Sequence, residues 1–280
     1  MRKYLFLFLF FSISLNYSQD RKEIEVKRFQ TPPVIDGKLI DFNNHMKRLD
    51  RSMTELKFKK LLNHLDILIF HRKLIELNNL KEGMIYLQVT RGVADRSFDM
   101  PKDKIEPTVL AFTQEKKIID SESAKNGIKV MTLDDMRWKR CDIKTTQLLY
   151  ASMAKTEATE KGFDDAWMLR EGYVTEGSSS NAWIIKGKTI MTRQSDNLIL
   201  SGITRDAIFK CAKDLGYEVV TKNITLPDAQ SASEAFITSA TACVMPVVKI
   251  NASQIGDGKP GKFVTALRAE YIKQAVASAI

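Results

Sequence analysis

The feature that most constrains the fold of this chain is an irregular alternation of short strand-like and helical stretches. Runs rich in β-branched and aromatic residues predict strands at 84–92, 108–114, 127–134, 165–172, 181–192, 217–225, 234–240 and 244–250. Apolar residues at helical spacing predict helices within 44–80 and at 148–162, 202–216 and 262–280. Because this order is no regular strand–helix–strand repeat, an α+β or mixed α/β fold is expected.

Composition narrows the class of partner. The 280 residues carry a formal net charge of +9, but the basic residues are scattered and do not interleave with aromatic ones. Nucleic acid is therefore not the expected partner, whereas small anionic substrates suit a diffuse positive field. Three distant cysteines and three histidines form neither a disulfide framework nor a metal-binding pattern, so no metal is expected and a reducing compartment is favoured.

The first twenty residues point the other way. Arg2 and Lys3 precede an apolar run from Tyr4 to Leu15, which is too short to span a membrane but typical of a secretory signal. The following stretch, 28–38, contains Pro32 and Pro33 and reads as a turn. Stable membrane insertion is not expected, and export stands as the alternative to a cytoplasmic location.

Three places have chemical potential. Gly202 precedes a predicted helix whose free N–H groups, at Ile203 and Thr204, suit an anion such as phosphate. Lys144 follows an apolar residue at the end of a strand-like run, and a lysine there can form a Schiff base if its pKa is lowered. Glu176 lies in "VTEGSSSN", where a carboxylate could accept a hydrogen bond from a ring N–H. Taken singly, these are more simply a capped helix, a surface lysine and a polar loop.

Taken together, the stretches "RCDIK", "VTEGSSSN", "LILSGITR" and "FITSATACVMPV" resemble, in order and spacing, D-amino acid transaminase. That family belongs to the class IV, or fold type IV, pyridoxal-phosphate enzymes, together with branched-chain aminotransferases and aminodeoxychorismate lyase. The resemblance runs from about Gly37 to the C-terminus. It implies a small α/β domain, a larger mixed-sheet domain, pyridoxal 5'-phosphate as cofactor, and amino-group transfer from D-amino acids to a 2-oxo acid.

The resemblance also implies roles for individual residues. Lys144 would bind the cofactor covalently and later move the substrate α-proton. Glu176 would contact the pyridine nitrogen and keep the ring protonated. Ser179 and Ser180 would brace the cofactor, and Leu200 would pack on its ring.

The phosphate of the cofactor would lie on the predicted helix N-terminus. Ile203 and Thr204 would donate N–H groups, and Arg48 would add a charge-assisted bond. Ser239 and Ala240 would supply a further phosphate contact, although Ala240 lacks the hydroxyl of the family's usual threonine.

Arg96 corresponds to the arginine that binds the substrate α-carboxylate in this family. The family's usual histidine two residues later is Phe98 here, so half of the expected carboxylate site is replaced. This leaves the substrate less defined than the fold.

The front of the chain departs from the family pattern. Residues 1–36 resemble the leader of an unrelated exported bacterial protein, which predicts a chimeric N-terminus, a partial small domain over 37–117 and a large cofactor-binding domain over 118–280. The loss of front strands would expose sheet edges, destabilise the small domain and impair activity. The resemblance also implies a homodimer with its active site near the subunit boundary.

Two kinds of alternative remain. A branched-chain aminotransferase or an aminodeoxychorismate lyase would share the scaffold, although Arg96 disfavours the former. An exported, non-catalytic binding protein would follow from the leader, and it predicts no colour with the cofactor.

Overall fold

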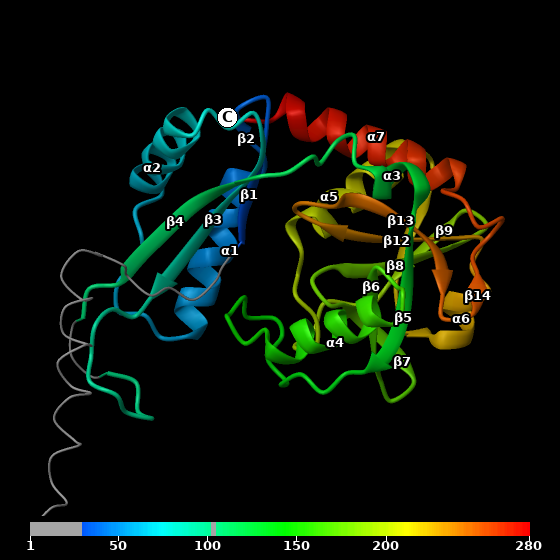
Figure 1. Cartoon of the computed structure of the whole chain (residues 1–280), viewed down its shortest axis with the longest axis horizontal. Helices are drawn as coiled ribbons and strands as arrows, with labels where there is room; N and C mark the ends of the chain where they lie inside the picture. The colour runs from blue at the N-terminus through cyan, green and yellow to red at the C-terminus, as the bar shows by residue number, and fades with distance from the viewer. Residues whose placement is uncertain (1–29, 102–104) are drawn as a thin grey trace, which may run out of the picture.

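The structure is a computed structural model that describes residues 30–101 and 105–280. The N-terminal lobe, at the left of Figure 1, is built on a four-stranded antiparallel sheet with the strand order β2-β1-β3-β4. Its strands are β1 (Gln30–Ile35), β2 (Lys38–Leu39), β3 (Glu82–Thr90) and β4 (Thr108–Glu115). The cross-strand pair Ile85 and Thr113 fixes the register of β3 against β4.

Two helices, α1 (Phe42–Glu55) and α2 (His64–Leu77), pack on this small sheet. In α1, Met46, Leu49 and Met53 recur at spacings of three and four residues, so one face of the helix is apolar and buried. They meet Ile85 and Leu87, which point to the same side of β3 because side chains alternate along a strand. The opposite side of β3 is left for the residues that line the cavity described below.

The C-terminal lobe contains a ten-stranded mixed sheet, ordered β10-β9-β8-β12-β13-β5-β6-β7-β11, with β14 paired to β13. Its strands are β5 (Ile128–Asp134), β6 (Asp165–Arg170), β7 (Tyr173–Gly177), β8 (Asn181–Lys186), β9 (Thr189–Thr192), β10 (Glu218–Thr221), β11 (Ile224–Thr225), β12 (Glu234–Ser239), β13 (Cys243–Ile250) and β14 (Ser253–Gln254). β5 pairs in parallel with both β6 and β13, and β9 in parallel with β10, while the remaining pairs are antiparallel.

Five further helices cover this sheet: α3 (Glu122–Asn126), α4 (Leu149–Glu160), α5 (Ile203–Asp214), α6 (Leu226–Gln230) and α7 (Lys262–Ala277). Helices α5 and α7 lie together over one side, where Trp183 and Phe236 stack at the centre of the core. Trp167 anchors a second apolar cluster. The central strands read as nearly continuous buried runs because both of their sides are covered.

The predicted strands and helices are largely confirmed, as is the α+β class with a smaller and a larger sheet. The prediction of a turn at 28–38 was wrong for Gln30–Ile35, which forms β1. The strand tolerates Pro33 because the β1–β3 register shifts between Gln30 and Pro33, and the Pro33 carbonyl still accepts from Ile40 N–H. Residues 30–35 therefore share a sheet with β3, whereas residues 1–29, which carry most of the predicted leader, lie outside the described residues.

Two local predictions at the chemical motifs were also wrong. The stretch that ends at Lys144 is not a strand but a series of turns after β5, so its backbone is free to enter the space between the two sheets. Glu176 lies on β7 rather than in a loop, and only residues 178–180 form the turn that leads into β8. A strand holds a side chain at a set direction, so Glu176 is more firmly placed than a loop residue.

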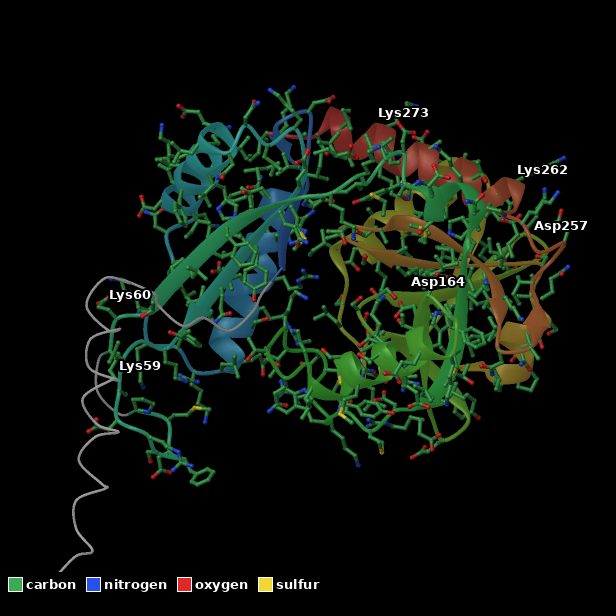
Figure 2. All side chains as sticks on the ribbon, in the orientation of Figure 1. Lys59, Lys60, Asp164, Asp257, Lys262 and Lys273 are labelled. Atoms are coloured by element: carbon green, nitrogen blue, oxygen red, sulfur yellow. The ribbon has the colours of Figure 1, made fainter. Side chains whose placement is uncertain are left out.

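The charged surface is spread over both lobes. Lys59 and Lys60 lie on the small lobe, and Lys262 and Lys273 lie along α7 on the large lobe (Figure 2). Among the described residues, no helix has both the length and the apolar character needed to cross a bilayer.

Candidate functional site

A cavity of about 590 Å³ opens between the two sheets. The small lobe contributes Met84, Tyr86 and Phe112 from β3 and β4, together with His45 and Arg48 from α1. The large lobe contributes the turns after β5, the end of β7, the start of α5 and the end of β12. The site is therefore assembled from segments that are distant in sequence.

Most of the sequence-predicted site residues meet in this one cavity. Those that line it are Arg48, Lys144, Glu176, Ser179, Ser180, Leu200, Ile203, Thr204, Ser239 and Ala240. Arg96 and Phe98 do not line it. They lie in the segment after β3, where Phe98 is 98% exposed and the Arg96 guanidinium lies 5.5 Å from the centre of the Phe98 ring.

Lys144 presents its amine to the cavity. Its backbone N–H donates to Ser52 Oγ at 3.3 Å, which ties the turn to α1. The Nζ atom has no hydrogen bond or ion pair with any described residue. Burial, reinforced by the charge of Arg48 and opposed by Glu176, lowers the pKa of Lys144 to about 7. The amine is therefore partly neutral at neutral pH, as a nucleophile or base requires.

The Glu176 carboxylate is buried and held by several donors. Arg137 Nη1 donates to Oε1 at 2.5 Å, Asn181 Nδ2 donates to Oε2 at 3.0 Å, and Leu200 N–H donates to Oε2 at 3.1 Å. Burial raises the pKa of Glu176 to about 7, against the opposing charge and hydrogen bond of Arg137. The side chain is thus fixed in direction and lies close to a change of charge at neutral pH.

The N-terminus of α5 forms the anion-binding end of the cavity. Gly202 is the N-cap and brings no side-chain cap, so the first N–H groups of the helix stay available to a ligand. A Cβ on Gly202 would lie 2.2 Å from Asn181 Oδ1, so any side chain here would force the Asn181 amide to shift. Arg48 lies alongside and donates from Nη1 to the Ser201 carbonyl at 3.3 Å. Together these groups suit a phosphate.

The three serines after Glu176 differ in their surroundings. Ser178 donates to the buried carboxylate of Asp165, so it belongs to the framework. Ser179 is exposed at the cavity. Ser180 Oγ is buried and has no hydrogen-bond partner among the described residues. A buried, unpartnered hydroxyl at a cavity wall is the mark of a place that a polar ligand completes.

Several cavity residues had escaped the sequence reasoning. His45 is buried three residues before Arg48, and burial together with the charges of Arg48 and Lys144 lowers its pKa well below the usual value. Tyr86 and Phe112 stack with their ring centres 4.6 Å apart on the small-lobe wall. The spacing of His45 and Arg48 on one helix face was readable, whereas the pairing of Arg137 with Glu176, 39 residues apart, had no local signal.

The arrangement has a clear chemical capacity. At one end, a helix N-terminus and Arg48 offer donors to a doubly charged group. A lysine amine of lowered pKa and a fixed carboxylate face the same space. The donor set fits a planar, phosphate-bearing aldehyde with a basic ring nitrogen: phosphate at α5, nitrogen at Glu176 and carbonyl carbon at Lys144.

Comparisons with known proteins agree with this geometry. The family model for amino-transferase class IV matches residues 28–250. D-alanine aminotransferase of Staphylococcus aureus is 36% identical over 242 residues, which cover 86% of this chain and 85% of that protein. The branched-chain amino acid aminotransferase of Escherichia coli superposes with a TM-score of 0.78 at 22% identity, covering 92% of this chain and 90% of that one.

A third similarity extends the range of chemistries on this fold. A Legionella pneumophila structure, provisionally described as a 4-amino-4-deoxychorismate lyase, superposes with a TM-score of 0.79 at 20% identity. The superposition covers 89% of this chain and 91% of the Legionella pneumophila chain. At such identities the two superpositions establish the fold alone.

Proposed function

Since the chain belongs to the class IV amino-transferase family, we propose that it transfers the amino group of a D-amino acid to a 2-oxo acid such as 2-oxoglutarate. The observation that carries the proposal is the meeting of Lys144, Glu176 and the α5 N-terminus in one cavity. The identity of 36% to a D-alanine aminotransferase supports the D-amino acid as donor. The family and the donor set together make the chain a pyridoxal-phosphate-dependent aminotransferase.

The residues present fit pyridoxal 5'-phosphate. Arg48, the N–H groups of Ile203 and Thr204, and the Ser239–Ala240 turn would hold the phosphate. Ser180 would donate its unpartnered hydroxyl, with Ser179 beside it, and Leu200 would pack against the ring. When bound, the cofactor supplies an electron sink for the charge that develops when the substrate α-proton leaves.

The protein side of the reaction centres on two groups. Lys144 Nζ, with a pKa of about 7, is suited to take the α-proton of the amino donor and, in the second half of the reaction, to deliver a proton to the α-carbon of the acceptor. Glu176, held by Arg137, Asn181 and Leu200, provides a negative charge of set direction for a ring nitrogen. Both groups are shielded from bulk water, which strengthens their electrostatic effect.

The test is an absorption titration of the purified chain with pyridoxal phosphate, followed by a transfer assay. The wild type is expected to develop a long-wavelength band that D-alanine bleaches and 2-oxoglutarate restores, with pyruvate and glutamate as products. Lys144→Ala is expected to abolish both the band and the transfer, whereas Lys139→Ala, at an exposed lysine five residues upstream, leaves both unchanged. Transfer from L-leucine with none from D-alanine would favour a branched-chain enzyme instead. No band at all would refute the enzyme assignment.

We also propose that the working form is a homodimer in which Arg96 of one subunit serves the cavity of the other. The support is that Arg96 does not line the cavity of its own chain. Its neighbours Val93 and Phe98 are 89% and 98% exposed, and exposed apolar side chains in one segment are typical of a surface covered by a partner. Phe98 would line the same substrate-carboxylate end, without the hydrogen bond that a histidine offers.

A mixed-subunit experiment tests this arrangement. Arg96→Ala and Lys144→Ala are each expected to be nearly inactive alone. When they are unfolded together and refolded, about half of the dimers are mixed, and each mixed dimer regains one complete site, so activity returns to about a quarter of the wild-type level. No recovery would mean that Arg96 acts within its own chain.

Domain division and location complete the proposal. We propose that the two sheets are the cores of two domains joined between β4 and β5, near residue 117, with β1 extending the first domain back to Gln30. Cooperative folding of residues 118–280 produced alone would support this division, and failure of that part to fold would contradict it. A cytoplasmic location is proposed because Cys141, Cys211 and Cys243 are free thiols. Fractionation of cells that produce the full chain tests this.

A further inference from the structure

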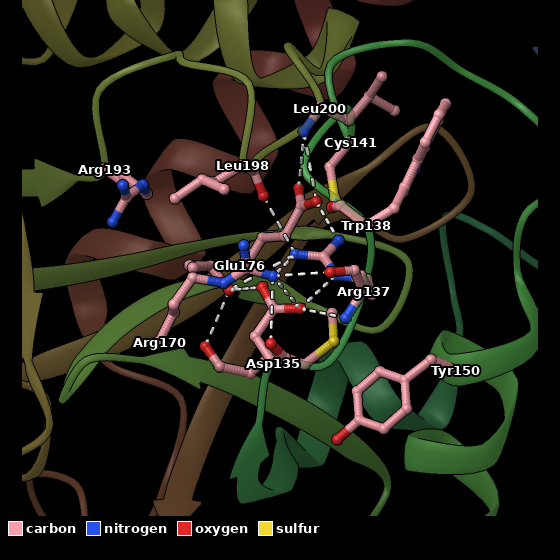
Figure 3. Close-up of polar contacts among 12 residues, drawn as sticks. Asp135, Arg137, Trp138, Cys141, Tyr150, Arg170, Glu176, Arg193, Leu198 and Leu200 are labelled. Atoms are coloured by element: carbon pink, nitrogen blue, oxygen red, sulfur yellow. Dashed lines mark hydrogen bonds and ion pairs between the residues drawn. The ribbon is translucent and has the colours of Figure 1, made fainter.

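Four charged side chains of alternating sign contact one another in the order Arg170, Asp135, Arg137 and Glu176, and the last two line the cavity (Figure 3). Arg170 Nη2 lies 3.4 Å from Asp135 Oδ1, Arg137 Nη2 lies 2.8 Å from Asp135 Oδ2, and Arg137 Nη1 lies 2.5 Å from Glu176 Oε1. The side chains of Asp135, Arg137, Arg170 and Glu176 are exposed by 0%, 10%, 16% and 6%. Four charges are thus gathered in a nearly water-free region.

The guanidinium of Arg137 is shared between two carboxylates. Its Nε and Nη2 atoms donate to both oxygens of Asp135, at 3.0 and 2.8 Å, and this bidentate contact fixes the plane of the group. Its Nη1 is then aimed at Glu176. A further bond from Nη2 to the Leu198 carbonyl, at 3.2 Å, ties Arg137 to the segment that leads to Leu200.

Asp135 is itself held in place by several groups. Thr175 Oγ1 donates to Oδ2 at 2.8 Å, and Thr175 directly precedes Glu176 on β7. Arg170 donates to the Asp135 and Arg137 carbonyls. Burial alone would raise the pKa of Asp135, but Arg137 and the Thr175 hydroxyl together lower it, so Asp135 is ionised at neutral pH. Arg137 therefore always divides its charge between two acids.

We propose that Arg137, positioned by Asp135, opposes the tendency of burial to neutralise Glu176 and sets how strongly that carboxylate holds a proton shared with the cofactor ring nitrogen. Arg137 is then a positioning residue for the reaction. The inference rests on the proposed function for the cofactor contact, but the effect on Glu176 is a property of the chain itself. Without Arg137, burial would leave Glu176 neutral, and a neutral acid cannot keep a ring nitrogen protonated.

Other charged groups also face Glu176 and must be held constant. Asp135 and Arg137 approach it from the turn after β5, Cys141 and Lys144 from the following turns, and Arg205 from α5. Of these charged groups in the described chain, only Arg137 donates a hydrogen bond to the Glu176 carboxylate oxygens. The variants below therefore change only the shared guanidinium or its competitor.

The first test measures the ionisation of Glu176 in the full chain without cofactor. The carboxyl infrared band of Glu176 is identified by subtracting the spectrum of Glu176→Gln and is followed against pH. Arg137→Met is expected to raise the midpoint of this titration by roughly 1–3 pH units. Asp135→Asn, which removes both the acid that competes for Arg137 and its direct repulsion of the Glu176 charge, is expected to lower it. Shifts of opposite sign are required, because general loosening of the structure would move both variants the same way.

The second test measures the cofactor nitrogen in the holoenzyme. The chain is loaded with pyridoxal phosphate carrying ¹⁵N in the ring, and the nitrogen chemical shift reports whether the ring is protonated. Arg137→Met is expected to move the signal toward the unprotonated value, and Arg137→Lys, which keeps the charge without the planar contact, is expected to restore most of it.

The outcomes separate the two proposals. Opposite midpoint shifts support the role of Arg137 even if the wild type takes up no cofactor, a result that would refute only the proposed function. Midpoints that move together, or do not move, overturn the inference. A protonated ring signal in Arg137→Met equal to that of the wild type overturns it as well. If Arg137→Met does not fold, Asp135→Asn and Arg137→Lys still give the required signs, downward for the first and upward for the second.

Discussion

At the scale of single residues, the cavity moves two opposite groups toward neutrality. Burial lowers the pKa of Lys144 and raises the pKa of Glu176, each to about 7, because a charge loses its hydration when protein replaces water. Both groups can therefore change protonation near neutral pH. Strongly shifted pKa values of buried groups that face one cavity are typical of functional sites.

Because of these two pKa shifts, the free energy of unfolding of the cofactor-free chain should depend on pH. Between pH 4.5 and about 7, the folded chain keeps a proton on Glu176 that the unfolded chain has lost, so its free energy of unfolding falls as pH rises. Between about 7 and 10.5, the unfolded chain keeps a proton on Lys144 that the folded chain has lost, so the free energy rises.

Urea denaturation at a series of pH values checks both slopes. Relative to the wild type, Glu176→Gln should remove the falling part and Lys144→Met the rising part. Exposed Lys139→Met is the matched control and should remove neither. A wild-type chain whose dependence on pH matches that of Lys144→Met above pH 7 would contradict the lowered pKa of Lys144.

Ser178 and Ser180 are expected to have different roles, the first in the stability of the fold and the second in cofactor binding. Ser178→Ala removes a hydrogen bond to buried Asp165 and should lower the free energy of unfolding by about 1–2 kcal/mol. Ser180→Ala removes an unpartnered hydroxyl and should change stability by less than about 0.5 kcal/mol, but weaken cofactor binding by about 1 kcal/mol. Thermal melts and cofactor titrations of both variants give the comparison. Equal effects on cofactor binding would exclude a specific contact at Ser180.

At the scale of elements, the start of α5 at Gly202 packs against Asn181 of the neighbouring strand β8. Asn181, the first residue of β8, donates from Nδ2 to Glu176 Oε2 and to the Leu200 carbonyl, at 3.0 and 2.8 Å. One amide thus links the carboxylate to the turn that enters α5. The missing side chain of Gly202 makes room for it.

Gly202→Ala should therefore disturb both ends of the cavity. The new Cβ would force Asn181 to move, so Glu176 would lose one donor and the helix N-terminus would shift. Cofactor affinity is expected to fall at least about tenfold, consistent with the loss of one or two buried hydrogen bonds. Ser201→Ala, which keeps the carbonyl that Arg48 uses, is the control and should bind normally. The measurement is a fluorescence titration with cofactor, and normal affinity in Gly202→Ala would show that Asn181 has room to adapt.

At the scale of the whole molecule, the segment that carries Lys144 also joins the two lobes. Arg51 of α1 donates to the Asp142 carbonyl and to its Oδ2, both at 2.7 Å. Arg140 donates to Asp142 Oδ1 at 3.0 Å and to Glu55 of α1 at 2.6 Å. Lys144 is thus positioned by polar contacts between lobes, with Ser52 adding one more.

Asp142→Ala should weaken the polar contacts between the two lobes but have little effect on the stability of the fold. Ion pairs open to solvent contribute little, so the free energy of unfolding should drop by no more than about 1 kcal/mol. The turnover number is expected to fall several-fold because Lys144 is less well placed, while KM changes little. Lys161→Ala, which removes a surface pair on α4, is the control. Steady-state kinetics decide, and a pure rise in KM would place the effect in substrate binding instead.

Much of the fold and of the candidate site could be predicted from the sequence. Spacing and residue type predicted the helices and most strands, since those preferences depend on near neighbours along the chain. The four quoted motifs identified the family, and ten of the predicted site residues line one cavity because motifs of this kind keep local backbone and chemistry together. The strand at Gln30–Ile35 was missed because two prolines mask the tendency of the segment to pair with β3.

Tertiary structure alone decided which side chains meet. Arg137 reaches Glu176 because the turn after β5 passes the end of β7, and no pattern within either segment specifies that contact. The family resemblance that predicted the cavity residues also predicted Arg96, yet Arg96 lies outside the cavity of its own chain. Local sequence determines how each segment folds, whereas burial, charge pairing and pKa depend on the register of segments far apart in the chain. Those quantities are therefore fixed only when the two sheets close around the site.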